Sequence, residues 1–145
     1  MSFFDAINVA ASGLTAQTTR MDVTAENLAN AQTTNGPGGQ PYQRQEVVLA
    51  QAGGGFGATL SGALGNSPAP GGVQVTGIVN DPTPDQLVYD PGHPGANAQG
   101  YVKMPNVNSV TEMTDMIDES NSYQADVTAM NTAKSMYTKM LSLLK

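Results

Sequence analysis

The C-terminal end of the chain carries the pattern that decides the fold. Residues 110–145 read VTEMTDMIDESNSYQADVTAMNTAKSMYTKMLSLLK. Alternating steps of three and four residues connect one set of positions along this whole stretch, as on one face of a helix. These positions hold Met113, Met116, Ser120, Tyr123, Val127, Met130, Lys134, Tyr137, Leu141 and Leu144. Since only Ser120 and Lys134 are not apolar, the pattern predicts a helix from about residue 110 to the terminus that packs along another helix.

A second helix is predicted at the N-terminal end. Ile7, Leu14, Met21 and Leu28 recur every seven residues, which indicates an amphipathic helix over residues 2–30. Ser2 and Asp5 form a capping pattern at its start, and the glycines and proline of residues 35–39 prevent its continuation. A long helix needs partners along its length, so we expect the two helices to pack together, with further subunits supplying the remaining contacts.

The start of the C-terminal helix is also marked. Ser109-Val110-Thr111-Glu112 has the pattern of a capping box, and Pro105 ends the segment before it.

The middle of the chain predicts short strands rather than helices. Alternating or β-branched residues occupy 43–51 and 73–79, with shorter candidates at 87–89 and 101–103. Residues 53–72 are rich in glycine, so we expect a flexible loop between two strands. The predicted fold class is α+β, with terminal helices packed antiparallel. Its three regions are 1–34, a central region 35–106, and 107–145.

Composition restricts the classes of function. The 145 residues carry only 6 lysines and arginines against 12 acidic residues, a net charge of −6 that disfavours nucleic acid as a partner. Large aliphatic residues are sparse, which favours a core shared with neighbouring molecules. Cysteine is absent. The sequence has neither a signal-peptide pattern nor an apolar run that could span a membrane, so we expect no membrane insertion and no cleaved leader.

Catalytic motifs are almost absent. His93 is the single histidine and lies between glycines and prolines, which is typical of a turn. No Gly-x-Ser-x-Gly motif occurs, and the glycine run at 53–57 lacks the lysine of a phosphate-binding loop. The sequence therefore predicts no catalytic residue, no metal site and no cofactor.

A group of carboxylates on the predicted C-terminal helix allows two interpretations. Its members are Glu112, Asp115, Asp118, Glu119 and Asp126. They could bind a cation or share a proton. Because they fill the first half of the helix and lysines fill the second, as the helix dipole favours, we expect a solvated face or pairing between subunits. Asp126 is expected to be exposed.

Several stretches resemble a known family. Ala11-Ser12-Gly13-Leu14-Thr15-Ala16 and Ala25-Glu26-Asn27-Leu28-Ala29-Asn30-Ala31 resemble the N-terminal signature of flagellar rod and hook axial proteins. The residues that resemble the C-type proximal-rod family are Pro41-Tyr42, Tyr89-Asp90-Pro91-Gly92-His93-Pro94, Gly100-Tyr101-Val102-Lys103-Met104-Pro105-Asn106-Val107, Glu112-Met113 and Ser122-Tyr123-Gln124-Ala125-Asp126-Val127. The resemblance extends over nearly the whole chain and is weakest at residues 53–72.

This resemblance implies a structural subunit of the flagellar basal body. Its partners would be copies of itself, other rod subunits and the flagellar type III export apparatus, and its place the periplasmic rod. We expect assembly to depend on Phe3, Ile7, Leu14, Met21, Asn27, Leu28, Asn30, Met113, Met116, Tyr123, Val127, Met130, Tyr137, Leu141 and Leu144. Two other classes remain open: an adaptor that binds one partner at fixed stoichiometry, and an enzyme based on the carboxylates.

Overall fold

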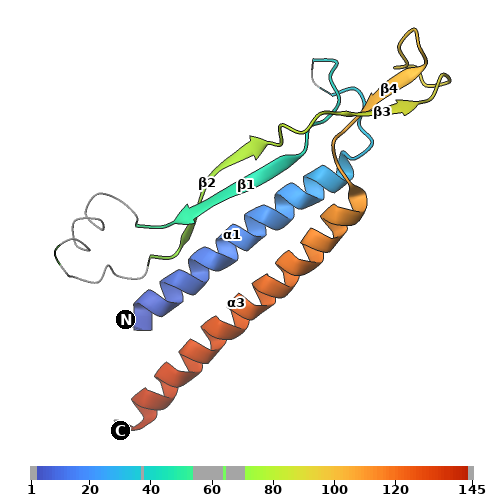
Figure 1. The fold of residues 1–145 in the computed structure, drawn as a ribbon. Coiled ribbons are helices and arrows are strands. Elements are labelled where there is room, and N and C mark those ends of the chain that lie inside the picture. The colour runs from blue at the N-terminus through green and yellow to red at the C-terminus, as the bar shows by residue number, and fades with distance from the viewer. Residues whose placement is uncertain (1–2, 37, 54–63, 65–70, 144–145) are drawn as a thin grey trace. The chain divides into compact units, whose positions relative to one another are not determined.

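The computed structural model describes residues 3–36, 38–53, 64 and 71–143. Figure 1 shows a long helix at each end of the chain and four short strands between them. The elements are α1 (Phe3–Ala29), β1 (Gln45–Gln51), β2 (Val73–Asn80), β3 (Gln86–Tyr89), β4 (Tyr101–Met104) and α3 (Ser109–Leu143). The two helices pack together, and the small antiparallel β insertion lies between them in the sequence. The predicted α+β class is therefore confirmed, and none of the described helices is long and apolar enough to span a membrane.

Both helices have a defined end at the side of the β insertion. Asn30, directly after α1, donates to the Glu26 carbonyl from both its backbone N–H at 3.0 Å and its side-chain amide at 2.9 Å, which reinforces the last turn of the helix. At the start of α3, Asn108 accepts from the backbone N–H groups of Val110 and Thr111 at 3.0 and 3.4 Å. Asn108 is therefore the N-cap. The predicted capping box that ends at Glu112 is wrong, because that side chain binds elsewhere.

The strands form two separate two-stranded ribbons, β1 with β2 and β3 with β4. In the second ribbon Leu87 pairs with Lys103 and Tyr89 with Tyr101. The two tyrosine rings meet edge to face with centroids 5.3 Å apart. Gly100 precedes this pair with a φ of +83°, and a Cβ there would lie 2.8 Å from the Tyr89 ring. The turn thus needs glycine for its backbone angle and for the close ring.

At one end of the β1–β2 ribbon, the backbone at Ala52 lies very close to the backbone at Gly71 and Gly72. At the base of the ribbon, the Ala52 N–H donates to the Gly72 carbonyl at 2.7 Å. A Cβ on Gly71 would lie only 1.6 Å from the Ala52 carbonyl oxygen, so this position cannot carry a side chain. Most of the predicted flexible loop at 53–72 lies outside the described residues.

The described residues fall into two compact units. One combines α1 up to Thr19, the segment Val48–Gly77 and α3 from Glu119 onward; the other combines Arg20–Val47 with Ile78–Asp118. Each unit thus pairs one half of α1 with the opposite half of α3, as antiparallel helices require. Each unit also contains one end of the β1–β2 ribbon.

The buried interior is small and unusually polar. Among the described residues, the buried apolar side chains are those of Ala16, Val23, Pro41, Val102, Pro105 and Val107. Several polar side chains are buried beside them, namely Thr24, Asn27, Glu112 and Glu119. Specific hydrogen bonds therefore hold the segments of the chain together where a larger protein would rely on apolar packing.

Candidate functional site

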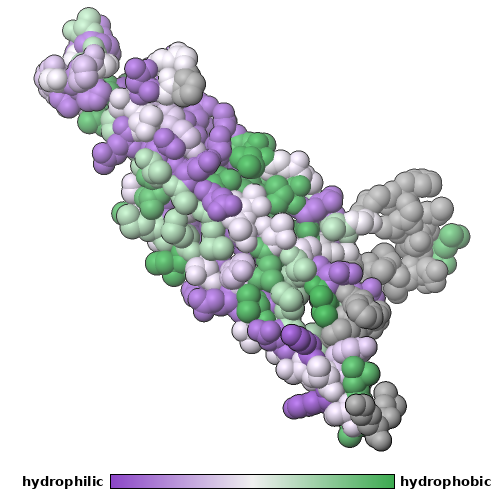
Figure 2. Space-filling view, turned by 180° about the vertical axis from the view of Figure 1, so that it is seen from behind, coloured by the Kyte–Doolittle hydropathy of each residue, from purple (hydrophilic) through white to green (hydrophobic). Residues whose placement is uncertain are grey.

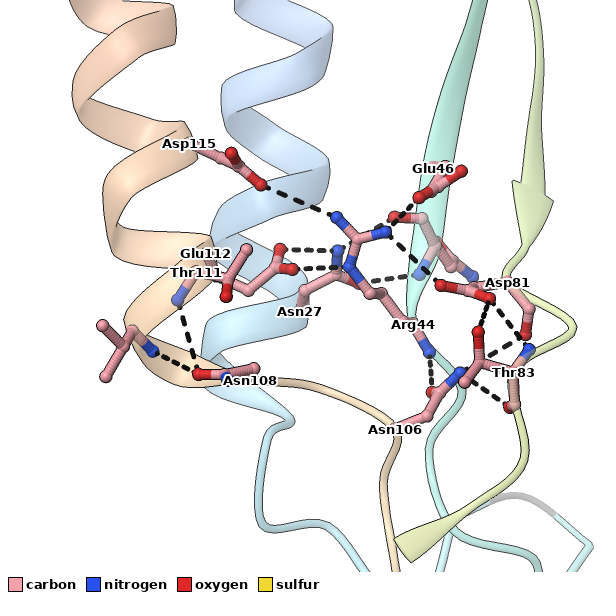
Figure 3. A network of polar contacts seen from close by, with 12 residues as sticks. Asn27, Arg44, Glu46, Asp81, Thr83, Asn106, Asn108, Thr111, Glu112 and Asp115 are labelled. Carbon is pink, nitrogen blue, oxygen red and sulfur yellow. Dashed lines mark hydrogen bonds and ion pairs between the residues drawn. The ribbon is translucent and has the colours of Figure 1, made fainter.

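Asn27 is the centre of a buried polar cluster at the end of α1, drawn in Figure 3. It is 1% exposed. Its amide nitrogen donates to the Gln45 carbonyl at 2.9 Å and to Glu112 Oε2 at 3.0 Å. Its oxygen accepts from Tyr42 Oη and from the Gln45 N–H, both at 2.9 Å. Every hydrogen-bonding site of this amide is occupied within the chain, so Asn27 joins α1 to β1 and α3.

Glu112 completes the cluster from the first turn of α3. This carboxylate is 1% exposed, and Oε1 accepts a 2.6 Å hydrogen bond from Arg44 Nε while Oε2 accepts the one from Asn27. A buried carboxylate is costly unless it is paired with a cation and hydrogen-bonded, and here both conditions are met. The charge of Glu112 is thus neutralised inside the chain.

Arg44 connects this buried pair to the surrounding segments. Its guanidinium also contacts Glu46, lies 3.5 Å from Asp81 and 3.7 Å from Asp115. Burial alone would lower the pKa of Arg44, but the hydrogen bonds to Glu112 and Glu46 outweigh it and raise the pKa. Arg44 therefore remains a fixed positive charge.

The backbone at Arg44 is held by a second amide side chain. Asn106 Oδ1 accepts from the Arg44 N–H at 2.8 Å. The Asn106 amide donates to the carbonyls of Asp81 and Thr83 at 3.3 and 3.0 Å. The Thr83 hydroxyl and N–H donate to the Asp81 carboxylate, and these bonds, more than its contact with Arg44, lower the pKa of Asp81. Two asparagines thus tie together segments that lie far apart in the sequence.

The cluster also affects a tyrosine. Burial of Tyr42 raises its pKa from the usual 10.0, and the nearby negative charges of Glu26 and Glu112 raise it further. The neutral phenol is the form that donates to Asn27. The cluster therefore holds the proton on this hydroxyl.

This arrangement corrects the prediction for the acidic residues. Glu112 and Glu119 are 1% and 4% exposed, so the expectation of a solvated face is wrong for both. Asp126 is half-buried, not exposed, and a Cβ on Gly13 would lie 2.8 Å from its Oδ2, which places it against α1. Among the described residues, no group of three or more His, Asp or Glu is arranged to hold a metal ion.

The predicted turn at His93 is confirmed. Its Nδ1 accepts from the Gly95 N–H at 3.0 Å, and its own N–H donates to the Asp90 carbonyl at 3.3 Å. The imidazole lines an open pocket of about 490 Å³ together with Asn97 and Tyr101. None of these side chains forms a nucleophile and base pair with it.

The predicted assembly residues of α1 fall into two groups. Asn27 and Asn30 make the contacts within the chain described above. The apolar residues lie elsewhere on the helix: Ile7, Leu14 and Met21 each stand two positions before an inner residue, Val9, Ala16 and Val23. At about 100° per residue, two positions separate side chains by roughly 160°. The heptad stripe is therefore turned away from Val9, Ala16 and Val23, but its large side chains are still half-buried within the chain.

We call this opposite stripe the outer seam of α1. It consists of Ile7, Ala11, Leu14, Thr18, Met21, Ala25 and Leu28, at alternating steps of four and three residues. The large side chains are half-buried and the small ones exposed. The stripe is thus partly accessible along its length, as in helices that pack against a further helix.

The predicted residues of α3 are exposed to different degrees. Met113 and Leu141 are 51% and 47% exposed. Met116, Tyr123, Val127, Met130 and Tyr137 are half-buried. Leu144 and the side chain of Phe3 lie outside the described part of the chain. Further apolar residues that sequence reasoning did not select are highly exposed, namely Val110, Ile117, Met136, Met140 and Leu143. Figure 2 shows apolar side chains at the surface between hydrophilic ones.

The polar cluster itself was missed by the sequence analysis. Asn27, Tyr42, Asn106 and Glu112 nevertheless all lie in stretches that carried the family resemblance. Arg44 follows Tyr42 by two residues. The signal was thus present as a set of motifs, but neither spacing nor periodicity indicated that these motifs meet in space.

Family models match both helical ends of the chain. The model described as flagella basal body rod protein matches residues 7–37, which contain most of α1 and the following turn. The model described as flagellar basal body rod FlgEFG protein C-terminal matches residues 98–143, which contain β4 and α3. Together with the paired terminal helices, these matches define the class as flagellar basal-body rod proteins.

Curated relatives narrow the class to one family. A flagellar basal-body rod protein FlgC of Escherichia coli O6:H1 is 46% identical over 143 residues, covering 99% of this chain and 98% of the relative. The FlgC proteins of Bacillus subtilis and Borreliella burgdorferi are 45% and 41% identical, with 100% of this chain covered. The chain belongs to the FlgC family and is thereby a structural subunit of the flagellar basal-body rod.

Proposed function

We propose that this chain polymerises through its terminal helices into the proximal part of a hollow drive shaft that transmits torque from motor to hook. Residues 1–34 and 107–145 would form the axial core of the shaft, and 35–106 a region outside it. Its partners are copies of itself and other rod subunits. It reaches the periplasm through the flagellar type III export apparatus without a cleaved signal peptide, and it serves flagellum-dependent motility.

The observation that carries this proposal is the outer seam of α1. Its large side chains, Ile7, Leu14, Met21 and Leu28, are only half-buried within the chain and lie beside the exposed Ala11, Thr18 and Ala25, so this stripe remains partly available to a neighbouring subunit. A helix with a second, partly exposed apolar stripe beside its packed face is suited to contact other helices on more than one side. A rod subunit surrounded by other subunits provides that environment.

A purely mechanical role, without enzymatic activity, is part of the proposal. The carboxylate best placed for catalysis by burial, Glu112, is paired with Arg44 and hydrogen-bonded to Asn27. Such a carboxylate has no free oxygen lone pair directed at solvent and its charge is neutralised. It therefore supports the fold and is unsuited to proton transfer.

The test is a substitution on the outer seam, made in cells that lack the native protein. Met21→Glu places a charge on the seam, while Gln32→Glu adds the same carboxylate at an exposed position beyond α1. We expect Met21→Glu cells to export a folded monomer but to build no rod and not to swim. Gln32→Glu cells should swim normally. Normal rods with Met21→Glu would refute the seam as an assembly surface, and a small closed complex in place of a filament would favour an adaptor.

A further inference from the structure

The last turns of α3 extend beyond its partner helix. In the first unit Gly13 of α1 lies against Asp126 of α3. Counting from this contact in opposite directions, Phe3, the first residue of α1, falls opposite Met136. The remainder of α3, up to Leu143, therefore has no segment of α1 beside it. The exposure of these turns supports this, because every residue from 138 to 143 is exposed.

The overhanging end of α3 carries exposed apolar side chains on one side of the helix. Met136, Met140 and Leu143 are 61%, 55% and 85% exposed. They follow one another by four and three residues and so share one side of the helix. Lys139 lies on the same side, directly before Met140, and is exposed. The overhanging end thus presents an apolar stripe flanked by a positive charge.

The outer seam of α1 has the complementary properties. Its small residues, Ala11, Thr18 and Ala25, are exposed, and small side chains allow unbranched ones such as methionine to approach the helix closely. Asp22 flanks the seam, four residues after Thr18 and three before Ala25, and is exposed. In the part of the chain that the structure describes, neither Asp22 nor Lys139 takes part in an ion pair.

We propose that the overhanging end of α3 in one copy packs on the outer seam of α1 in a second copy, with Lys139 paired to Asp22. This inference rests on the proposed function and assigns the contact through which copies join. Charge selects this pairing over the alternatives. If the α1 seams of two copies packed together, Asp22 would face the acidic residues of the other α1. If the first half of α3 packed on the seam instead, Asp115 and Asp118 would lie near Asp22. Lys139 offers the opposite charge beside an unused apolar stripe.

A charge-exchange experiment tests the pairing. Three variants are expressed in cells that lack the native protein: Asp22→Lys, Lys139→Glu, and both together. Lys103→Glu, on β4 and away from both helices, is the control for loss of a positive charge. Rods are counted in purified basal bodies, and swimming is scored in soft agar. Because Asp22 and Lys139 are exposed, circular dichroism of the purified monomers should show an unchanged fold.

The expected result is a fall in rod number of at least about tenfold for each single variant, since one charge flanking a helix contact is repeated in every subunit of the filament. The double variant should recover to more than half of the wild-type number, and the control should match wild type. Single variants that assemble normally, or a double variant no better than the singles, would overturn the pairing. Absence of the wild-type chain from rods would instead refute the proposed function itself.

Discussion

Glu112→Gln is the substitution that most directly probes the buried polar cluster. Glutamine has nearly the same shape as glutamate but is neutral, and one of its two terminal atoms becomes a donor. Glu112 receives donors on both oxygens, from Arg44 Nε at 2.6 Å and from Asn27 at 3.0 Å. In either orientation, the new amide group would direct N–H bonds at an existing donor. Rotating the amide does not remove this conflict.

The expected cost follows from burial. Glu112 is 1% exposed, so water cannot replace the lost bond. Removing one partner of a buried ion pair destabilises a protein by roughly 3–5 kcal/mol. We expect about 3 kcal/mol, the lower end of that range, because Arg44 keeps Glu46, Asp81 and Asp115 as neighbours. For a chain of this size that corresponds to a fall in melting temperature of about 10 °C.

The measurement is the free energy of unfolding of the purified monomer in urea, followed by circular dichroism. Glu46→Gln is the matched control, because Glu46 also contacts Arg44 but its side chain is 53% exposed. An exposed ion pair contributes less than about 1 kcal/mol, so the free energy of unfolding of this variant should be close to that of wild type. If Glu112→Gln loses no more stability than Glu46→Gln, the cluster does not stabilise the fold as we describe.

Three further outcomes are expected. Because the pKa of Tyr42 is raised in the folded state, its stabilising effect is present below its unfolded pKa of 10.0 and is lost as the pH rises through the folded value. Urea titrations from pH 9 to 12 should show this loss in wild type, and an identical loss in Tyr42→Phe would contradict the assignment. Gly71→Ala should lower the free energy of unfolding by about 2 kcal/mol or more through its clash with the Ala52 carbonyl. Gly77→Ala, where a Cβ meets nothing within 4 Å, should be nearly neutral, and equal effects would refute the clash. Limited proteolysis of the monomer should cleave first in the exposed last turns of α3, and early cleavage in β4 instead would contradict this.

The helices could be predicted from the sequence because their signal is local. Steps of three and four residues identified α3, and a heptad repeat identified α1, each to within a residue or two of the observed ends. The strands were also found, since β-branched residues and glycine-rich turns mark them locally. The three-region division of the chain remains a prediction.

Interpretation of the helix faces was harder for a physical reason. An apolar stripe indicates that a helix packs against something, but not against what. On α1 the repeat of Leu14 and Met21 marked a stripe that the chain only half buries, while the fully buried Ala16, Val23 and Asn27 are small or polar. Periodicity of hydrophobic residues cannot reveal such a face.

The buried cluster depends on contacts between distant segments. Glu112 lies 68 residues from Arg44 and 85 from Asn27. A carboxylate on a helix is exposed in most proteins, so the sequence alone favoured a solvated face. Only the arrangement of the chain shows that one arginine, from a chain with few positive charges, lies beside it.

The most direct test of the account is the location of this chain in the cell. Basal bodies should be purified from cells that carry an epitope on the exposed turn near Gln99, and the rod examined by immunogold labelling and by electron cryomicroscopy. We expect label confined to the proximal rod and density for α1 and α3 in a helical layer, with the seam of α1 against a neighbouring subunit. Basal bodies with complete rods that contain none of this chain would contradict the central claim.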